Sequence, residues 1–487
     1  MVDILAWAVG WRWENLGGRR YFLHRTLREV YFQLRLDDRL HLPPPPSLSV
    51  PEARIFRAKA GSSEIFSLND MEAIRAFLNH KDFLYRSKNW VVREIVELGF
   101  SGYGGAPWDI NRRFSLKILR ELGFGRSAMG EIISEGSRLL LNKIAESKGQ
   151  PIDLFDLILG SVSSNFEVLL LGYRYPLEHP EHQLLCQALR DEFRTTRDGS
   201  VLSFFPSLAK AVAKWLPCSQ TATLFAAMKW IEKFSSTRLS DHMDALNEKD
   251  GGDFIAAYLR RTKEHNQKKE PAYGLPCLVG NIVSFLVAGA VSASASLMRE
   301  LLLVAANPDT IQERIRKEID AVVGSERRPA WDDRVSTPYT MAFIWETHRL
   351  YTIAPLGLPR RAYKDVVIGQ HFIPKDATVV PNIWAVHNNP VIWKDPAKFD
   401  PKRFLKSDGS LSKKKFKKVI PFSVGRRMCP GESFASVEIY VYLTSILQNF
   451  HVLPVKGDVV DVNLKYGEIM LPGRQMLRCI PRINAAT

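Results

Sequence analysis

The chain has 487 residues, of which 46% are hydrophobic and 24% are charged, a composition that excludes an intrinsically disordered protein. Its five scattered cysteines do not form a secreted disulfide framework and favour a reducing compartment. The net charge of +15 favours an anionic membrane surface or an acidic protein partner; we expect no nucleic-acid partner, because no zinc-finger, basic-zipper or RNA-binding signature accompanies the charge.

The first 49 residues divide into two parts. Residues 1–42 form an atypical N-terminal segment whose apolar start, residues 1–11, is too short to span a bilayer and lacks the features of a signal peptide. Residues 19–35 fit an amphipathic basic helix lying on a membrane and, equally well, an ordinary surface helix. Residues 43–49 carry a run of four prolines and predict a stiff hinge.

Beyond the hinge the pattern is mainly helical, with a smaller β-rich portion. Residues 55–68 predict a pair of strands, and Asn69-Asp70 predicts the cap of a helix that continues through residue 78. Helical patterns dominate to about residue 345, and β-rich runs follow at residues 355–381 and after His451. We expect one large, mainly α domain over residues 50–487, with a β-rich portion built from distant segments.

Residues 275–298 contain no charged side chain over 24 positions, which is long enough for a transmembrane helix. Small and polar residues such as Gly280, Asn281 and Ser284 are unfavourable against lipid, however. A helix through the core of a large protein is also apolar on all sides. We therefore predict a buried core helix.

A carboxylate and a guanidinium are predicted to pair inside the helix that begins at Thr337-Pro338. Glu346 and Arg349 stand at i and i+3 and share one helix face. Such pairs commonly decorate a surface, but the apolar neighbours of this one indicate that it is buried. A buried pair needs further hydrogen bonds, and Arg403 is a candidate third member.

Cys429 stands among glycines and arginines immediately before a predicted helix. A single cysteine is commonly a small buried hydrophobe, but a lone thiolate can also ligate haem iron. In that reading Gly425 and Gly431 let the backbone turn tightly beside a flat macrocycle. Arg427 would pair with a haem propionate, and Phe422 would cover the thiolate.

The phrase Phe-x-x-Gly-x-Arg-x-Cys-x-Gly, which ends at Gly431, closely resembles the haem-thiolate signature of the cytochrome P450 superfamily. Glu346-x-x-Arg349 resembles the K-helix motif of this family, and Arg403 falls where the family closes a Glu-Arg-Arg cluster behind the haem. The phrase that begins at Trp108 is most similar to the microsomal family 2 branch. The resemblance covers roughly residues 50–483 and implies the cytochrome P450 fold, with residues 50–487 as the haem-thiolate catalytic domain.

The resemblance implies haem b as the cofactor, with Cys429 as the axial ligand of its iron. The side chains that would contact the cofactor around this ligand come from several segments: Phe422, Arg427, Arg112, Trp108, Arg360 and Arg86. The arginines and the tryptophan among them would hold the propionates.

In the predicted core helix, the family pattern of small residues, an acid and a threonine is replaced by Ala288-Gly289-Ala290-Val291-Ser292. Ala288 and Gly289 would leave room for dioxygen, and the Ser292 hydroxyl would hold a water or pass on a proton. Since Val291 replaces the acid, proton delivery would run through water or Ser292. The substrate cavity would be lined by apolar side chains from distant segments: Phe285, Val291, Ile353, Leu356 and Met470.

The implied activity is oxygenation of a hydrophobic small molecule (a xenobiotic, a steroid or a fatty acid) by O2, with electrons from NADPH through a flavoprotein reductase. The lysines of residues 413–418 and Arg426 would form the reductase surface, although each lysine alone also fits a solvated charged loop. The implied location is the cytoplasmic face of the endoplasmic reticulum membrane, with a mitochondrial or soluble protein as alternatives. The alternative functions are a haem-thiolate isomerase or dehydratase of lipid hydroperoxides, favoured by Val291, and a haem-binding protein without turnover.

Overall fold

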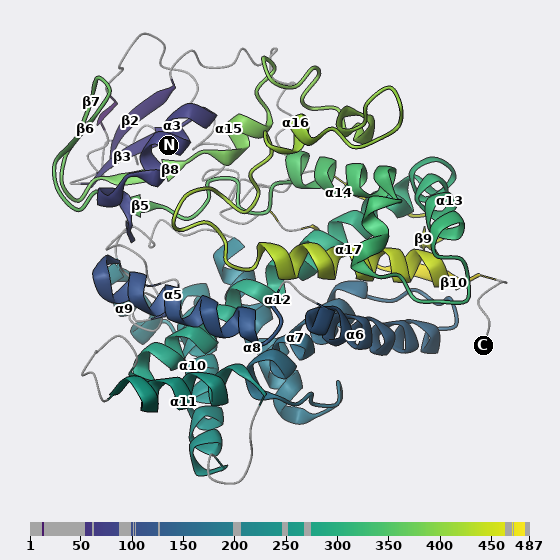
Figure 1. Cartoon of the computed structure of the whole chain (residues 1–487), viewed down its shortest axis with the longest axis horizontal. Coiled ribbons are helices and arrows are strands. Elements are labelled where there is room, and N and C mark those ends of the chain that lie inside the picture. Colours follow the sequence, from purple (N-terminus) through teal and green to yellow (C-terminus); the bar gives the residue numbers. More distant parts are fainter. Residues whose placement is uncertain are drawn as a thin grey trace.

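A computed structural model describes residues 12–13, 54–60, 63–86, 99–100, 102, 104–124, 127–197, 206–245, 252–266, 274–462, 470 and 472–482. A large helical body occupies most of the molecule, and a small sheet lies at one side of it (Figure 1). The predicted mainly α fold with a smaller β portion is confirmed. The expectations for residues 1–11, 19–35 and 43–49 concern segments outside the described residues.

The helices follow one another along the chain as α3 (Met71–Asn79), α5 (Gly105–Glu121), α6 (Ser127–Glu146), α7 (Leu154–Leu171), α8 (Pro180–Arg197), α9 (Pro206–Trp215), α10 (Gln220–Ala245), α11 (Phe254–Asn266), α12 (Leu275–Ala306), α13 (Glu313–Val322), α14 (Pro338–Leu350), α15 (Ile383–His387), α16 (Lys413–Phe416) and α17 (Glu432–Asn449). A short 3-10 helix, η6, spans Pro401–Phe404. The strands are β1 (Arg12–Trp13), β2 (Ile55–Ala60), β3 (Ser63–Leu68), β4 (Tyr85–Arg86), β5 (Arg360–Arg361), β6 (Val366–Ile368), β7 (His371–Ile373), β8 (Thr378–Pro381), β9 (Phe450–Pro454) and β10 (Leu477–Pro481).

The larger sheet has the strand order β1-β2-β3-β8-β5-β4 and joins segments that are far apart in the sequence. The predicted strand pair at residues 55–68 is confirmed as the antiparallel pair β2 and β3. The predicted cap of α3 is confirmed as well, because the Asp70 carboxylate accepts a hydrogen bond of 2.7 Å from the Ala73 N–H. At the far edge of the sheet, the pairing of β4 with β5 places Arg86 opposite Arg360.

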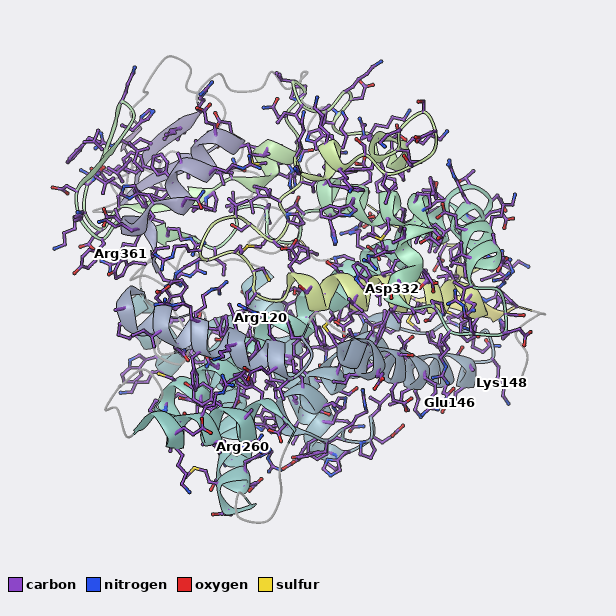
Figure 2. The ribbon with its side chains drawn as sticks, viewed as in Figure 1. Arg120, Glu146, Lys148, Arg260, Asp332 and Arg361 are labelled. Carbon is purple, nitrogen blue, oxygen red and sulfur yellow. The ribbon has the colours of Figure 1, made fainter. Side chains whose placement is uncertain are left out.

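The predicted core helix is α12, and the prediction is confirmed because most of its side chains are buried within the protein. It is longer than the uncharged stretch and continues through Arg299 and Glu300, both buried, to Ala306. Among the described residues, α7 and α12 have the length and hydropathy of a membrane span, but both lie mostly inside the protein. Charged side chains are instead spread around the outside in Figure 2, with Arg120, Glu146 and Lys148 among the exposed ones.

The contact between α12 and α7 depends on the missing side chain of Gly289. A Cβ atom built there would lie 2.2 Å from Cζ of Phe166 on α7. Phe166 is itself buried, and its ring lies 5.0 Å from the ring of Phe434 near the start of α17. The glycine therefore serves the packing of three helices in the core, because close-packed interiors have no room for an added methyl group.

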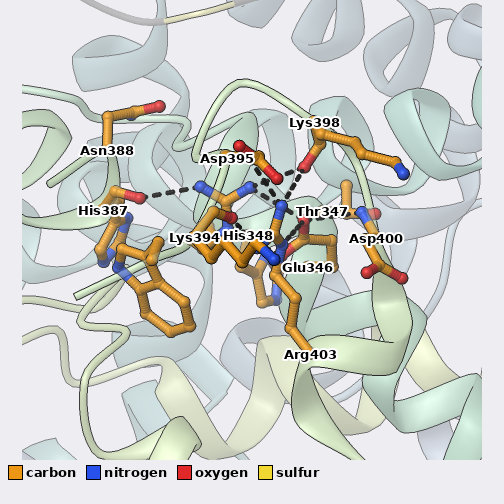
Figure 3. Close-up of polar contacts among 12 residues, drawn as sticks. Glu346, Thr347, His348, His387, Asn388, Lys394, Asp395, Lys398, Asp400 and Arg403 are labelled. Atoms are coloured by element: carbon orange, nitrogen blue, oxygen red, sulfur yellow. Dashed lines mark hydrogen bonds and ion pairs between the residues drawn. The ribbon is translucent and has the colours of Figure 1, made fainter. Parts of the chain in front are cut away.

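The predicted pair on α14 is a buried, bidentate ion pair (Figure 3). Arg349 donates from Nε to Glu346 Oε2 at 2.7 Å and from Nη2 to Glu346 Oε1 at 2.8 Å. Arg403, at η6, donates from Nε to the same Glu346 Oε1 at 3.2 Å. The structure thus brings together the three residues that the sequence singled out.

Backbone groups satisfy the rest of this network, which joins α14 to the segment that leads to η6. Arg349 Nη1 donates to the His387 carbonyl at 2.8 Å, and Glu346 Oε1 accepts from the Asp400 N–H at 2.9 Å. Arg403 donates to the carbonyls of Asp395, at 2.7 Å, and Lys398, at 2.9 Å. A buried ion pair is tolerated when such hydrogen bonds accompany it, so the network fixes these two segments together.

We predict that Glu346→Gln lowers the free energy of unfolding by about 3–5 kcal/mol, because two guanidinium groups then lose their buried counter-charge. Urea denaturation followed by circular dichroism measures the change. The matched control is Glu135→Gln, which breaks a solvent-exposed i, i+3 pair with Arg138 and should cost about 0–1 kcal/mol. Equal losses in the two variants would contradict the role of the network.

We predict that Gly289→Ala destabilises the protein by about 1–3 kcal/mol, because the new methyl group collides with the buried Phe166 ring. Gly130→Ala on α6 is the control, and we expect it to change the stability in the opposite direction. Among the described residues, no atom outside its own stretch of helix lies within 4 Å of a Cβ at Gly130, so alanine there should stabilise the helix by about 0.5–1 kcal/mol. Thermal unfolding of the two variants side by side checks both signs, and a neutral Gly289→Ala would disprove the packing role.

Candidate active site

Cys429 lies at the N-terminus of α17, three residues before the helix begins. Burial raises the pKa of its thiol, while the backbone N–H groups of Gly431 and Glu432 and the guanidinium of Arg112 act in the opposite direction. The residue nevertheless keeps exposed surface. Since N–H groups and a helix N-terminus favour negative charge, this sulfur has the surroundings of a thiolate ligand.

The loop before the cysteine is closed by a 2.8 Å hydrogen bond from the Cys429 N–H to the Phe422 carbonyl. Gly425 has a φ of +81°, and a Cβ there would lie 2.6 Å from the Leu78 carbonyl oxygen, so the expected turn requires glycine. Gly431 differs from the expectation, since its φ of −86° suits any residue. A Cβ at Gly431 would lie 3.7 Å from the cysteine sulfur, so the glycine keeps the space beside Sγ open.

Four buried arginines converge beside this loop from separate segments. Arg86 and Arg360 are paired across β4 and β5, and Arg360 Nη2 donates to the Arg427 carbonyl at 3.3 Å. Arg112, on α5, donates to the Met428 carbonyl at 2.6 Å. The structure therefore brings together the four arginines that the sequence singled out for the propionates.

These arginines lack a sufficient counter-charge. Among the described residues, no carboxylate pairs with Arg86, Arg360 or Arg427, and five of their buried guanidinium nitrogens have no hydrogen-bond partner: Arg86 Nε, Arg360 Nε and Nη1, and Arg427 Nε and Nη2. Burial, together with repulsion from the other arginines, lowers the pKa of Arg427 to about 7 and that of Arg86 to about 9. The same causes lower the pKa of Arg360 well below its usual value. A cluster of this kind fits an anionic group that supplies more than one carboxylate.

Trp108 lies between two of these arginines. The guanidinium of Arg427 is 3.8 Å from the centre of a Trp108 ring, and that of Arg112 is 5.7 Å away. The indole N–H donates to the Phe100 carbonyl at 3.1 Å. The tryptophan in this structure is thus a platform for cations, and the direct propionate contact suggested by the sequence stays a prediction.

Two buried histidines that the sequence analysis did not select hold the start of the cysteine loop. His387 Nε2 accepts a hydrogen bond of 2.8 Å from the Ile420 N–H, and its Nδ1 lies 2.7 Å from the Thr352 hydroxyl. Burial lowers the pKa of His387 to about 3, so its ring is neutral and Nε2 remains an acceptor. His348, whose pKa burial lowers to about 4, packs edge-on against the Phe422 ring. The sequence did contain one signal for His387: a histidine within the apolar run of residues 383–387 is a candidate for a buried side chain.

The residues proposed for oxygen and proton chemistry lie on different sides of α12. Ala288 is exposed, and Gly289 and Ser292 keep partial exposure, whereas Val291 is fully buried in the core. The Ser292 hydroxyl donates to the Ala288 carbonyl at 2.7 Å. Its lone pairs are consequently the part of this group that is available to a water.

The residues proposed for the substrate cavity are only partly brought together. The Met470 N–H donates to the Ile353 carbonyl at 2.8 Å, which joins two segments distant in sequence. Phe285, on α12, is buried 5.0 Å from the ring of Phe100. Leu356 is partly buried.

These features fit haem b. Cys429 would ligate the iron, and the guanidinium nitrogens without partners would receive the two propionates. Small residues and apolar rings on α12 would border the macrocycle.

Comparisons with known proteins agree with this geometry. Residues 52–478 match the cytochrome P450 family. Cytochrome P450 2J1 of Oryctolagus cuniculus is 32% identical over 428 residues, which cover 87% of this chain and 83% of that protein. Cytochrome P450 2J2 of Homo sapiens is 28% identical over 89% of this chain and 87% of its own length, and cytochrome P450 2F5 of Gorilla gorilla gorilla is 32% identical over 75% and 73%.

The family and the branch indicated by the sequence are confirmed, because these relatives are all family 2 proteins. The match extends over the cysteine loop, the arginine cluster and the Glu346 network. The chain therefore belongs to the cytochrome P450 family of haem-dependent monooxygenases.

Proposed function

We propose that this enzyme inserts one oxygen atom from O2 into a hydrophobic small molecule of the xenobiotic, steroid or fatty-acid type. NADPH would supply the electrons through a flavoprotein reductase. The observation that carries the proposal is the thiol at the N-terminus of α17 beside four arginines that lack a sufficient counter-charge. A haem held there supplies oxygen activation, and the thiolate favours cleavage of the O–O bond.

The residues of the chain would bind the cofactor and hold it in position. Cys429 would be held as a thiolate by the N–H groups of Gly431 and Glu432. Arg86, Arg360 and Arg427 would fix the cofactor by charge-assisted hydrogen bonds.

The proton route on α12 depends on a hydroxyl. Because the Ser292 hydroxyl is committed to the Ala288 carbonyl, we expect it to accept a hydrogen bond from a water and so hold that water in place. Val291 is apolar and fully buried, so Ser292 is the residue of this pair that can hold a water.

We place the protein at the cytoplasmic face of the endoplasmic reticulum membrane. The net charge of +15 and the membership in family 2 support this location. Exposed apolar side chains at the end of α9, Trp215 and Leu216, fit contact with a lipid surface. We also propose the division of the chain into an N-terminal segment (residues 1–42), a hinge (residues 43–49) and the catalytic domain (residues 50–487).

Reconstitution with the reductase, NADPH and a mixed panel of lipids and drug-like compounds tests the function. We expect a product heavier by one oxygen atom, and this product should depend on NADPH and O2. Conversion of a lipid hydroperoxide without NADPH or reductase would instead establish the isomerase alternative. A bound haem with no turnover under any of these conditions would establish a haem-binding protein.

We predict that Cys429→Ala abolishes the red-shifted Soret band of the ferrous carbon monoxide complex, because the thiolate is the source of that shift. The absorbance spectrum of the haem-loaded variant measures this. The control is Cys218→Ala, which removes an exposed cysteine and should leave the band unchanged. Retention of the band in Cys429→Ala would refute the assignment of the ligand.

The reductase surface is proposed at α16. Lys413, Lys414 and Lys417 are exposed there, while Phe416 packs inward 5.1 Å from the ring of Trp345. Because Phe416 packs inward, the lysines on the other side of α16 face the solvent. A positive patch of this kind would attract an acidic flavoprotein.

We predict that reversing all three charges (Lys413→Glu, Lys414→Glu and Lys417→Glu) slows reductase-supported reduction of the haem at low salt by about tenfold, because steering of the acidic partner is lost. Stopped-flow spectroscopy under carbon monoxide follows the reduction. The control reverses three exposed lysines on α10 and α11, at the other end of the view in Figure 1: Lys229, Lys233 and Lys263. Equal slowing by both triple variants would contradict a specific surface.

A further inference from the structure

A second cysteine lies in a polar cluster between α8 and α7 that the proposed oxygenation does not use. Cys186 Sγ is 3.5 Å from His182 Nε2, and His182 Nδ1 is 2.6 Å from Glu167 Oε1. All three residues are buried, with exposed fractions of 5%, 2% and 0%. A thiol, an imidazole and a carboxylate in this order have the arrangement of an activated nucleophile.

Local structure fixes each member of the cluster. His182 and Cys186 stand at i and i+4 on α8, so their side chains share one face of the helix. The second carboxylate oxygen of Glu167 accepts a hydrogen bond of 3.2 Å from the Tyr175 N–H. Because Glu167 holds Nδ1, the other ring nitrogen is directed at the sulfur.

The imidazole of His182 is a strong proton acceptor in this cluster. Burial alone would lower the pKa of His182, but the hydrogen bonds and charges of Cys186 and Glu167 outweigh it and raise this pKa to about 10. A proton that leaves the thiol can therefore rest on the ring. At the other two buried cysteines, burial raises the pKa of Cys277 and raises that of Cys479 to about 12.

We propose that Cys186 is a peroxide-reactive thiol and a site of reversible oxidation, with His182 as its base and Glu167 as the residue that positions the base. The oxidant is hydrogen peroxide. The thiolate attacks one peroxide oxygen, so that an S–O bond forms and the O–O bond breaks. The departing hydroxide takes the proton from His182 Nε2 and leaves as water, while the sulfur is oxidised by two electrons to a sulfenic acid.

The surroundings suit a small oxidant. The outer face of α8 is at the surface, with Gln183 and Leu184 exposed, and Cys186 itself keeps 5% of its surface exposed. Gly160 on α7 keeps space beside the base, since a Cβ there would lie 3.5 Å from His182 Nε2. The added oxygen must be accommodated between α7 and α8, so oxidation will also loosen the packing of α8.

The test uses the haem-loaded full-length chain at neutral pH, treated with hydrogen peroxide in the presence of dimedone, which traps sulfenic acids. Mass spectrometry of the peptides gives the labelling rate of each cysteine. We expect Cys186 to be labelled at least about ten times faster than Cys277, which is similarly buried at 8% but has a raised pKa. Labelling of Cys186 no faster than that of Cys277 would overturn the proposal.

Two variants separate activation from simple exposure. His182→Gln should slow the labelling of Cys186 by about tenfold, because the base is lost. His179→Gln, which removes a neighbouring histidine that stacks on Tyr175, should leave the rate unchanged. Unchanged labelling in a folded His182→Gln variant would overturn the role of the base. Circular dichroism reports the folding, and the comparison of cysteines within the unmutated chain decides the proposal independently of either variant.

Discussion

The constraint on which this site depends is the burial of four guanidinium groups without enough negative charge to balance them. Arg86, Arg112, Arg360 and Arg427 come from β4, α5, β5 and the cysteine loop, and they meet only in the folded chain. Desolvation and mutual repulsion both oppose this arrangement, as the lowered pKa values show. A dianionic cofactor bound here would offset both costs, so its binding energy would also stabilise the packing of these segments.

Much of the site could be predicted because its residues carry local signals. The cysteine loop concentrates its ligand and one arginine within ten residues, and Glu346 and Arg349 are related by helical spacing alone. The strand pair and the core helix follow from composition and periodicity over short windows. In each case the residues that produce the local structure lie within a few positions of one another in the sequence.

The residues that were missed act across long distances in the sequence. His387 holds Ile420, and Phe166 fills the space left by Gly289. In each case the partner lies far away in the sequence, and nothing in one segment identifies its partner in the other. The assignment of Gly289 to oxygen chemistry stays a prediction, because a small residue in a motif does not reveal which neighbour needs the space. The fold shows that the neighbour is an aromatic ring on α7.

The cysteines show how far the surroundings, and not the residue type, decide chemistry. Burial raises the thiol pKa at Cys429, Cys277 and Cys479, and at Cys429 the N–H groups of Gly431 and Glu432 and the guanidinium of Arg112 act together in the opposite direction. Those groups stabilise a thiolate without taking its proton, which suits a permanent ligand. Cys186 has an imidazole in place of the N–H groups, and an imidazole both takes a proton and returns it. A metal ligand must remain charged through turnover, whereas a reversibly oxidised thiol must exchange protons, so the two environments suit different chemistries within one fold.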